Sequence, residues 1–189
     1  MNENINIDEQ RRIRRIIDGK HGEYAYFVRK YSQQVLDFTS RMITDSMDAE
    51  EVAQDAFVKA FRSLESFAFQ SSFLTWVCRI AYHESINRMR HKKAHWVDID
   101  DIPLSGDGMP EEELPTDREE RIQRLEEAID VLSPIEQMLI HLYYYEKKTL
   151  REIAFIMDVK PNALANRLHR IRQKLLRIIK DKENERDQG

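Results

Sequence analysis

Apolar side chains recur at spacings of three and four residues along most of the chain, the periodicity of amphipathic helices. In the first half this pattern predicts four helices, over residues 8–18, 23–43, 48–62 and 73–93. Their expected inward residues are Ile13, Ile16 and Ile17; then Tyr24, Phe27, Tyr31, Val35, Phe38 and Met42; then Ala49, Val52, Ala53, Ala56, Phe57, Ala60 and Phe61; and finally Phe73, Trp76, Val77, Ile80 and Ala81.

The second half repeats the helical periodicity. It predicts helices over residues 120–132, 134–143, 150–156 and 161–179. Their expected inward residues are Ile122, Leu125, Ala128 and Ile129; then Met138, Leu139, Leu142 and Tyr143; then Leu150, Ile153, Ala154 and Ile156; and finally Leu164, Leu168, Ile171, Leu175 and Ile179. The sequence therefore predicts an all-α fold.

Several predicted helix starts carry side chains that can accept hydrogen bonds from the free N–H groups of a first turn. These are Asp48 with Glu51 as a capping box, Ser71 with Ser72, Ser133 with Glu136 as a second capping box, and Thr149. Pro134 occupies the first helical position after Ser133, where proline is favoured.

The stretch between the halves differs in composition. Residues 94–115 contain three of the five prolines and two of the five glycines, together with an acidic excess. Such composition is typical of a flexible linker. We therefore expect two small helical domains, residues 1–93 and 118–189, joined by an acidic linker at residues 94–117.

Charge is segregated along the chain although its net value is only −4. Basic residues dominate the end of the fourth helix, and residues 160–182 hold eight Lys or Arg against one acid. Phe67, Phe69 and Trp76 lie just before the first basic block. Aromatic rings beside cations suit single-stranded nucleic acid, because bases stack on the rings while the cations replace phosphate counterions. The sequence leaves open whether Phe67 and Phe69 face DNA or the core.

The second basic block belongs to a helix-turn-helix pattern. Two short helices are separated by the turn at residues 158–160, and the second helix is rich in Arg. The start of such a second helix reads base edges in the major groove, where Asn pairs with adenine and Arg with guanine. The candidate DNA-contacting residues are Lys160, Asn162, Ala163, Asn166, Arg167, Arg170 and Lys174.

Other function classes are disfavoured. One cysteine, Cys78, excludes an internal disulfide framework and suits a reducing compartment. No apolar run is long enough for a membrane span, and no signal peptide is recognisable, so we expect a cytoplasmic protein without direct membrane insertion. His91 and His95, with Asp98 and Asp100 nearby, have a spacing that could bind zinc on a helix, but residues 94–96 lie where the helix should end and no Cys accompanies them. We expect no metal, no cofactor and no catalytic chemistry.

Taken together, DAEEVAQDAFVKAF, SSFLTWVCRIAYHESINRMR and LSPIEQMLIHLYYYEKKTLREIAFIMDVKPNALANRLHRIRQKL resemble bacterial sigma factors of the extracytoplasmic-function (ECF) group. The resemblance covers nearly the whole chain outside the linker. It implies a sigma region 2 over residues 23–93 and a sigma region 4 over residues 120–179. A stand-alone helix-turn-helix regulator of duplex DNA is the alternative.

The resemblance implies binding to core RNA polymerase through its flap and its largest-subunit clamp helices, the latter contacted by Glu51, Gln54 and Asp55. It also implies an anti-sigma factor, and promoter DNA bound both as duplex and as single non-template strand. The residues placed at the minus-ten element are Phe67, Phe69, Ser71, Trp76, Arg79, His83, Asn87, Arg88 and Arg90. The helix-turn-helix would read the minus-thirty-five element.

Four departures from the group's pattern leave the promoter sequence unassigned. His83 and Asn87 stand where Asn and Asp are common in the group. Asp158 stands in the turn where Gly is usual, and Asp tolerates the left-handed backbone conformation at some cost. Pro161, Asn162 and Ala163 replace a more usual Val-Gly-Thr.

Overall fold

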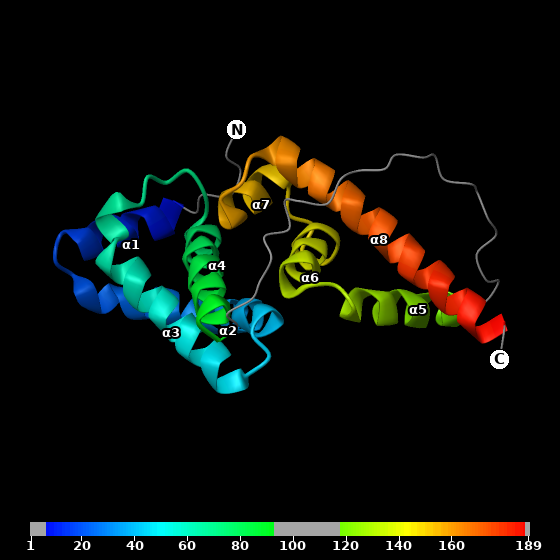
Figure 1. Cartoon of the computed structure of the whole chain (residues 1–189). Coiled ribbons are helices and arrows are strands. Elements are labelled where there is room, and N and C mark those ends of the chain that lie inside the picture. The colour runs from blue at the N-terminus through cyan, green and yellow to red at the C-terminus, as the bar shows by residue number, and fades with distance from the viewer. Residues whose placement is uncertain (1–6, 93–117, 188–189) are drawn as a thin grey trace.

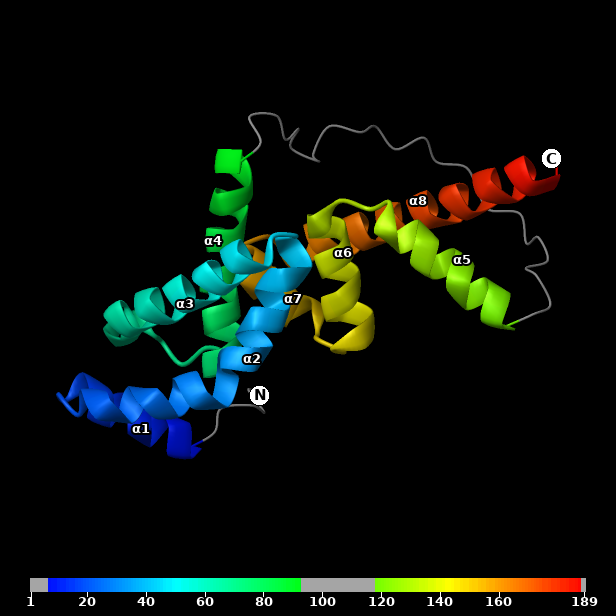
Figure 2. The ribbon, with the colours of Figure 1, turned by 90° about the horizontal axis from the view of Figure 1, so that it is seen from below.

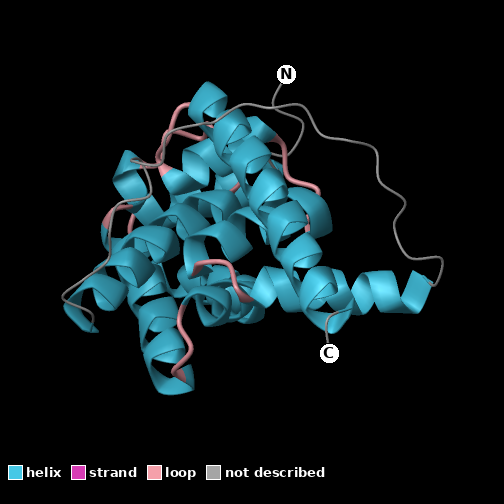
Figure 3. Cartoon of the chain, turned by 45° about the vertical axis from the view of Figure 1, so that its right-hand side comes forward, coloured by secondary structure: helices cyan, strands magenta, loops and turns pink. Residues whose placement is uncertain are grey.

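The computed structural model describes residues 7–92 and 118–187. Every regular element in this described part is helical, with loops between (Figure 3). The prediction of an all-α fold is therefore confirmed. The expected linker at residues 94–117 lies outside the described residues, and the three-part domain division remains a prediction.

The first half contains helices α1 (Ile7–Ile17), α2 (Tyr24–Met42), α3 (Ser46–Arg62) and α4 (Phe73–Lys92) (Figure 1). The short 3₁₀ turns η1 (His21–Glu23) and η2 (Leu64–Ser66) precede α2 and follow α3. Helices α2, α3 and α4 contact one another in all three pairs. The inward stripe of α3 contains four fully or nearly fully buried alanines, whose small side chains permit this close packing.

The second half contains α5 (Arg118–Asp130), α6 (Pro134–Ile140), α7 (Leu150–Met157) and α8 (Pro161–Asp187). Helix α6 continues as a single π-helical stretch, η4 (His141–Tyr145). The long α8 contacts α5, α6 and α7 and extends away from the first half (Figure 2). Leu164, Leu168, Ile171 and Leu175 of α8 are buried along this contact, as their spacing predicts.

The predicted caps are confirmed at three helices and wrong at one. Ser133 and Thr149 each form a complete capping box, and Ser72 accepts a hydrogen bond of 3.1 Å from the Thr75 N–H. Helix α3 begins earlier than predicted, because Asp45 is its N-cap and accepts from the Asp48 N–H at 3.0 Å. The expected Asp48–Glu51 capping box is therefore wrong.

Three side chains expected to face inward are exposed instead: Ile17, Ile122 and Leu125. Ile17 is the last residue of α1, where the chain leaves the helix. Ile122 and Leu125 share one face of α5, and Leu125 lines an open apolar groove of about 420 Å3 together with Ile129 and residues of α8. The periodicity of α5 is amphipathic, but its apolar stripe is wider than the surface that α8 covers.

The two halves pack against each other. Helix α4 contacts α7, and α2 contacts α6 (Figures 1 and 2). Buried apolar residues of both halves belong to one core cluster. The sequence did not predict whether the halves pack together, since neither apolar periodicity nor charge indicates which two amphipathic units meet.

Candidate nucleic-acid and protein interfaces

The loop between η2 and α4 forms an aromatic cluster on the start of α4. The Phe67 ring centroid lies 4.8 Å from that of Trp76 and 4.8 Å from that of Phe69. Phe67 is only 6% exposed, whereas Phe69, Ser71 and Trp76 are half-buried. Phe69 has a positive φ of 54°, an unfavourable region for a bulky residue. Phe67 is thus mainly core, and the strained backbone at Phe69 holds the second ring beside it.

A small cavity of about 180 Å3 lies against this aromatic cluster. This volume is below the roughly 300–1,000 Å3 of sites for whole drug-sized ligands, and suits a group such as a single ring. Its lining residues are Ser66, Phe67, Ala68, Gln70, Ser71, Trp76, Arg79 and, from α7 in the second half, Phe155. Four of these residues, Phe67, Ser71, Trp76 and Arg79, were predicted from the sequence to contact the minus-ten element, whereas Phe155 was not anticipated.

One face of α4 carries the polar residues expected at the melted element. Arg79, His83 and Asn87 are spaced by four residues and therefore share that face. Asn87 and the nearby Arg90 are exposed, and His83 is half-buried. Glu84 is an acid of the same helix, but its carboxylate pairs with the Lys59 ammonium of α3 at 2.5 Å. Arg79 pairs with the Asp158 carboxylate of the second half at 2.7 Å, so the exposed Arg90 supplies the positive charge at this end of α4.

The Arg88 side chain points towards α3 and not along the face formed by Arg79, His83 and Asn87. Its guanidinium donates to the Asp48 carboxylate at 3.0 Å and to the Glu51 carboxylate at 3.0 Å. The hydrogen bond with Glu51, assisted by both negative charges, raises the pKa of Arg88. Arg88 therefore ties α4 to the start of α3, and it links the expected DNA face to a residue expected on the polymerase face.

The candidate protein-docking face lies on the outer side of α3. Glu51, Gln54 and Asp55 are all exposed there. Beside them an open groove of about 470 Å3 runs between α2 and α3, lined mainly by apolar atoms of residues such as Leu36, Phe57 and Val58. An apolar centre with a polar rim is the ordinary anatomy of a protein–protein interface. The sequence predicted the acidic rim but not the groove, although Val58 is an apolar residue outside the buried stripe.

The turn between α7 and α8 has the geometry of a helix-turn-helix. Asp158 adopts the left-handed conformation, with φ 56° and ψ 45°, as the sequence predicted for this position. At the start of α8, Lys160, Asn162, Ala163 and Asn166 are exposed. Arg167 and Arg170 are half-buried.

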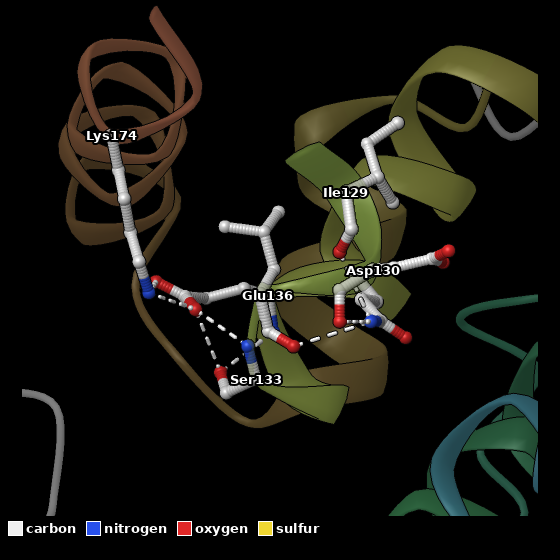
Figure 4. A network of polar contacts seen from close by, with 7 residues as sticks. Ile129, Asp130, Ser133, Glu136 and Lys174 are labelled. Atoms are coloured by element: carbon white, nitrogen blue, oxygen red, sulfur yellow. Dashed lines mark hydrogen bonds and ion pairs between the residues drawn. The ribbon is translucent and has the colours of Figure 1, made fainter. Parts of the chain in front are cut away.

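Lys174 joins α8 to the start of α6 (Figure 4). Its ammonium donates to Glu136 Oε2 at 2.8 Å, and the same carboxylate accepts from the Ser133 N–H at 2.8 Å. Although burial alone would raise the pKa of Glu136, hydrogen bonds from Lys174 and Ser133 outweigh it and lower that pKa. Lys174 therefore has a structural partner, and its contact with DNA remains a prediction.

We expect Glu136→Gln to destabilise the protein by about 1–2 kcal/mol at pH 7, the range of charge-assisted hydrogen bonds reduced for the part-exposed Lys174. A lowered folded-state pKa adds stability above the ordinary glutamate pKa, and this contribution disappears as pH falls through the folded value. The difference between wild type and Glu136→Gln in thermal unfolding should therefore shrink towards pH 4. Glu126→Gln, an exposed change on α5, is the control. If the difference in unfolding temperature between wild type and Glu136→Gln did not change with pH, the stabilising role assigned to the Glu136 carboxylate would be contradicted.

The remaining candidate residues show no site. Cys78 is buried, which raises its thiol pKa to about 12. His91 is exposed, and His95 lies outside the described residues. Within residues 7–92 and 118–187, no three His, Cys, Asp or Glu side chains gather as a metal site requires. None of the helices described is both long and apolar enough to cross a membrane.

Comparison with known proteins matches both halves to family models. The Sigma-70 region 2 model matches residues 27–95, and the Sigma-70, region 4 model matches residues 122–175. The ECF RNA polymerase sigma-E factor of Escherichia coli is 30% identical over 88% of this chain and 92% of its own length. The ECF RNA polymerase sigma factor SigW of Bacillus subtilis is 27% identical over 91% of this chain and 97% of its own.

Two solved structures share the fold. The structure of CnrH in complex with the cytosolic domain of CnrY gives a TM-score of 0.60 at 17% identity, covering 90% of this chain and 96% of that one. The sigma factor RpoE of Bartonella quintana, in complex with the anti-sigma factor NepR, gives 0.58 at 19% identity, covering 84% and 97%.

Proposed function

Because the chain belongs to the ECF group of the sigma-70 family, we propose that it binds core RNA polymerase, directs it to specific promoters and assists strand opening. The observation that carries this function is the presence of region 2 and region 4 together in one chain. A stand-alone regulator would need only the helix-turn-helix, and would leave the first half without a role.

In the proposed mechanism the outer face of α3 docks on the clamp helices of the largest polymerase subunit. Glu51, Gln54 and Asp55 form the polar rim of this contact, and the exposure of all three supports the assignment. The carboxylates of Glu51 and Asp55 favour a basic partner surface and steer its approach. Arg88 holds Glu51 in place from α4, so that docking and DNA binding share one rigid support.

Strand opening is assigned to the loop before α4 and to α4 itself. Extruding a base from duplex DNA costs a few kcal/mol. Stacking on an aromatic ring returns roughly 1–3 kcal/mol per base, and the small cavity lined by Phe67 and Trp76 has the size for a single ring. Arg79, His83, Asn87 and Arg90 then bind the flanking phosphates and bases of the non-template strand.

Duplex recognition is assigned to α8. Its exposed first turns would enter the major groove at the minus-thirty-five element, with Asn162, Asn166 and Arg167 towards base edges. Lys160 would contact phosphate. Lys174 lies more than three turns into α8 and is paired with Glu136, so we place it at the periphery of this contact.

An anti-sigma factor completes the set of proposed partners. The RpoE relative of similar fold was solved with the anti-sigma factor NepR bound. By analogy, the apolar grooves between α2 and α3 and between α5 and α8 offer surfaces for such a protein.

Permanganate footprinting tests this function directly, because it marks unpaired thymines. Core polymerase with this protein should open a bubble about one helical turn long on a cognate promoter, and core polymerase or the protein alone should not. Tight binding of the protein alone to duplex DNA, without polymerase-dependent opening, would favour the regulator instead.

A further inference from the structure

The first helix, α1, has no part in the function proposed so far, yet it carries a buried carboxylate. Glu9, Ile13 and Ile16 are spaced by four and three residues and share one face of α1. All three are buried, Glu9 with only 5% of its surface exposed. Burying a charge is costly unless the charge is paired and hydrogen-bonded. The role of Glu9 therefore depends on its partners.

Two side chains of α2 donate to the same oxygen of Glu9. The Lys30 ammonium donates to Glu9 Oε1 at 2.6 Å, and the Tyr31 hydroxyl donates to that atom at 2.6 Å. The hydrogen bond with Glu9 raises the pKa of Lys30. Burial, together with the hydrogen bond to Glu9, raises the pKa of Tyr31 to about 12. The Tyr31 side chain is thus oriented at its outer end by a charge-assisted hydrogen bond.

The Tyr31 ring extends this contact into the aromatic cluster. Its centroid lies 6.1 Å from that of Phe73, with the two ring planes at 30°. Phe73 is 2% exposed, and its centroid lies 6.3 Å from that of Phe67 and 6.1 Å from that of Trp76. Phe67 and Trp76 line the cavity that we assign to a flipped base. A chain of direct contacts therefore joins Glu9 on α1 to two rings of that cavity.

Helix α1 also contacts the other end of the loop that forms the cavity. It contacts η2, whose last residue, Ser66, lines the cavity. The far end of α1 is held as well, because Arg12 and Arg15 pair with Glu23 of η1 at 3.4 and 2.6 Å. A helix anchored towards both of its ends therefore supports the start of the loop and, through Tyr31, the start of α4.

We propose that Glu9 is a positioning residue for strand opening, which orients Phe73 through Tyr31 and so holds Phe67 and Trp76 in the geometry that receives the flipped base. This inference rests on the proposed function and gives α1 a part in it. Apolar contacts have little directional preference, whereas the hydrogen bond between a buried carboxylate and a hydroxyl specifies one arrangement. Rings that are already ordered lose less conformational entropy when a base stacks on them.

Tyr31→Phe tests this role with little disturbance, because it removes the hydroxyl and keeps the ring that packs on Phe73. Tyr26→Phe is the matched control, since it makes the same change at a hydroxyl that accepts a hydrogen bond from Lys30 at 3.2 Å. Glu9→Ala removes the acceptor altogether. Glu9→Gln keeps an acceptor oxygen in a side chain of the same shape, so it should restore much of what Glu9→Ala loses.

Hydrogen exchange in the free protein measures the order of the loop, because amides at its two ends are hydrogen-bonded. These are the N–H groups of Ser66, Phe67, Thr75 and Trp76. We expect their exchange to be about tenfold faster in Tyr31→Phe and Glu9→Ala, intermediate in Glu9→Gln and unchanged in Tyr26→Phe. Unchanged exchange in Tyr31→Phe and Glu9→Ala would overturn the positioning role. An equal increase throughout α2, α3 and α4 would indicate general destabilisation and would overturn it as well.

The second measurement uses core polymerase with each variant on a cognate promoter. We expect all variants to bind the still-paired promoter with wild-type affinity. The rate of strand opening, followed by permanganate, should be about tenfold lower in Tyr31→Phe and Glu9→Ala, the size expected for a hydrogen bond to a charged group. Opening rates equal to that of Tyr26→Phe would overturn the inference. Failure of the wild type to open the promoter would overturn the proposed function, and this outcome is distinguishable because every variant would then fail alike.

Discussion

Asp55→Arg is expected to abolish binding to core RNA polymerase while leaving the fold intact. Asp55 is exposed on the outer side of α3, next to Glu51 and Gln54. Reversing a charge within a complementary interface places like charges together, which costs several kcal/mol. We expect an affinity loss of about 100-fold or more, since each 1.4 kcal/mol is roughly tenfold. Titration of labelled protein with core polymerase measures this change.

Asp18→Arg is the matched control, because Asp18 is an exposed acid just after α1 and is not one of the residues assigned to the docking face. It makes the same charge change and should bind polymerase like the wild type. Both variants should unfold at the wild-type temperature, since neither side chain is buried. Unchanged polymerase affinity in Asp55→Arg would remove the docking assignment from this face of α3.

Arg167→Ala is expected to weaken promoter binding by about 1–3 kcal/mol and to relax the sequence preference at one position of the minus-thirty-five element. Arg167 lies in the second turn of α8, where a reading helix reaches base edges. The measurement is made with the polymerase complex, because in the free protein α4 lies close to this part of α8. Competition between the cognate promoter and single-base variants gives both the affinity and the preference.

Lys160→Ala supplies the contrast to Arg167→Ala. Lys160 precedes α8 and is assigned to phosphate, so its loss should weaken all sequences alike and reduce the salt dependence of binding. If Arg167→Ala also weakened every sequence equally, Arg167 would be a phosphate contact and not a base contact.

Helix locations and most caps could be predicted from the sequence because they depend on neighbouring residues. Ser133, Glu136 and Thr149 act within one turn of chain, and their capping boxes are confirmed. The apolar stripes of α3 and α8 also followed from spacing alone. At the start of α3, both Asp45 and Asp48 could serve as the N-cap, and Asp45 does so. Asp48 and Glu51 instead form ion pairs with Arg88 of α4.

The polar contacts between distant segments could not be predicted. From the sequence alone, Lys174 and Arg88 would be expected to be unpaired cations. In the structure each donates a hydrogen bond to a carboxylate nearly 40 residues away along the chain. Arg79 meets Asp158 across the two halves. Such pairs depend on how helices pack, and periodicity shows only that a residue faces outward, not what else faces it. The residues proposed to contact polymerase, the minus-ten element and the minus-thirty-five element therefore remain predictions, which mutagenesis can test.

Reconstituted transcription from a library of genomic promoters tests the proposed function most directly. Purified protein and bacterial core polymerase are mixed with the library, and the transcripts are sequenced. We predict transcripts that require this protein and start downstream of two shared elements at minus ten and minus thirty-five. Transcripts that do not depend on the protein, or core polymerase that fails to bind it, would contradict its assignment as a promoter-specific initiation factor.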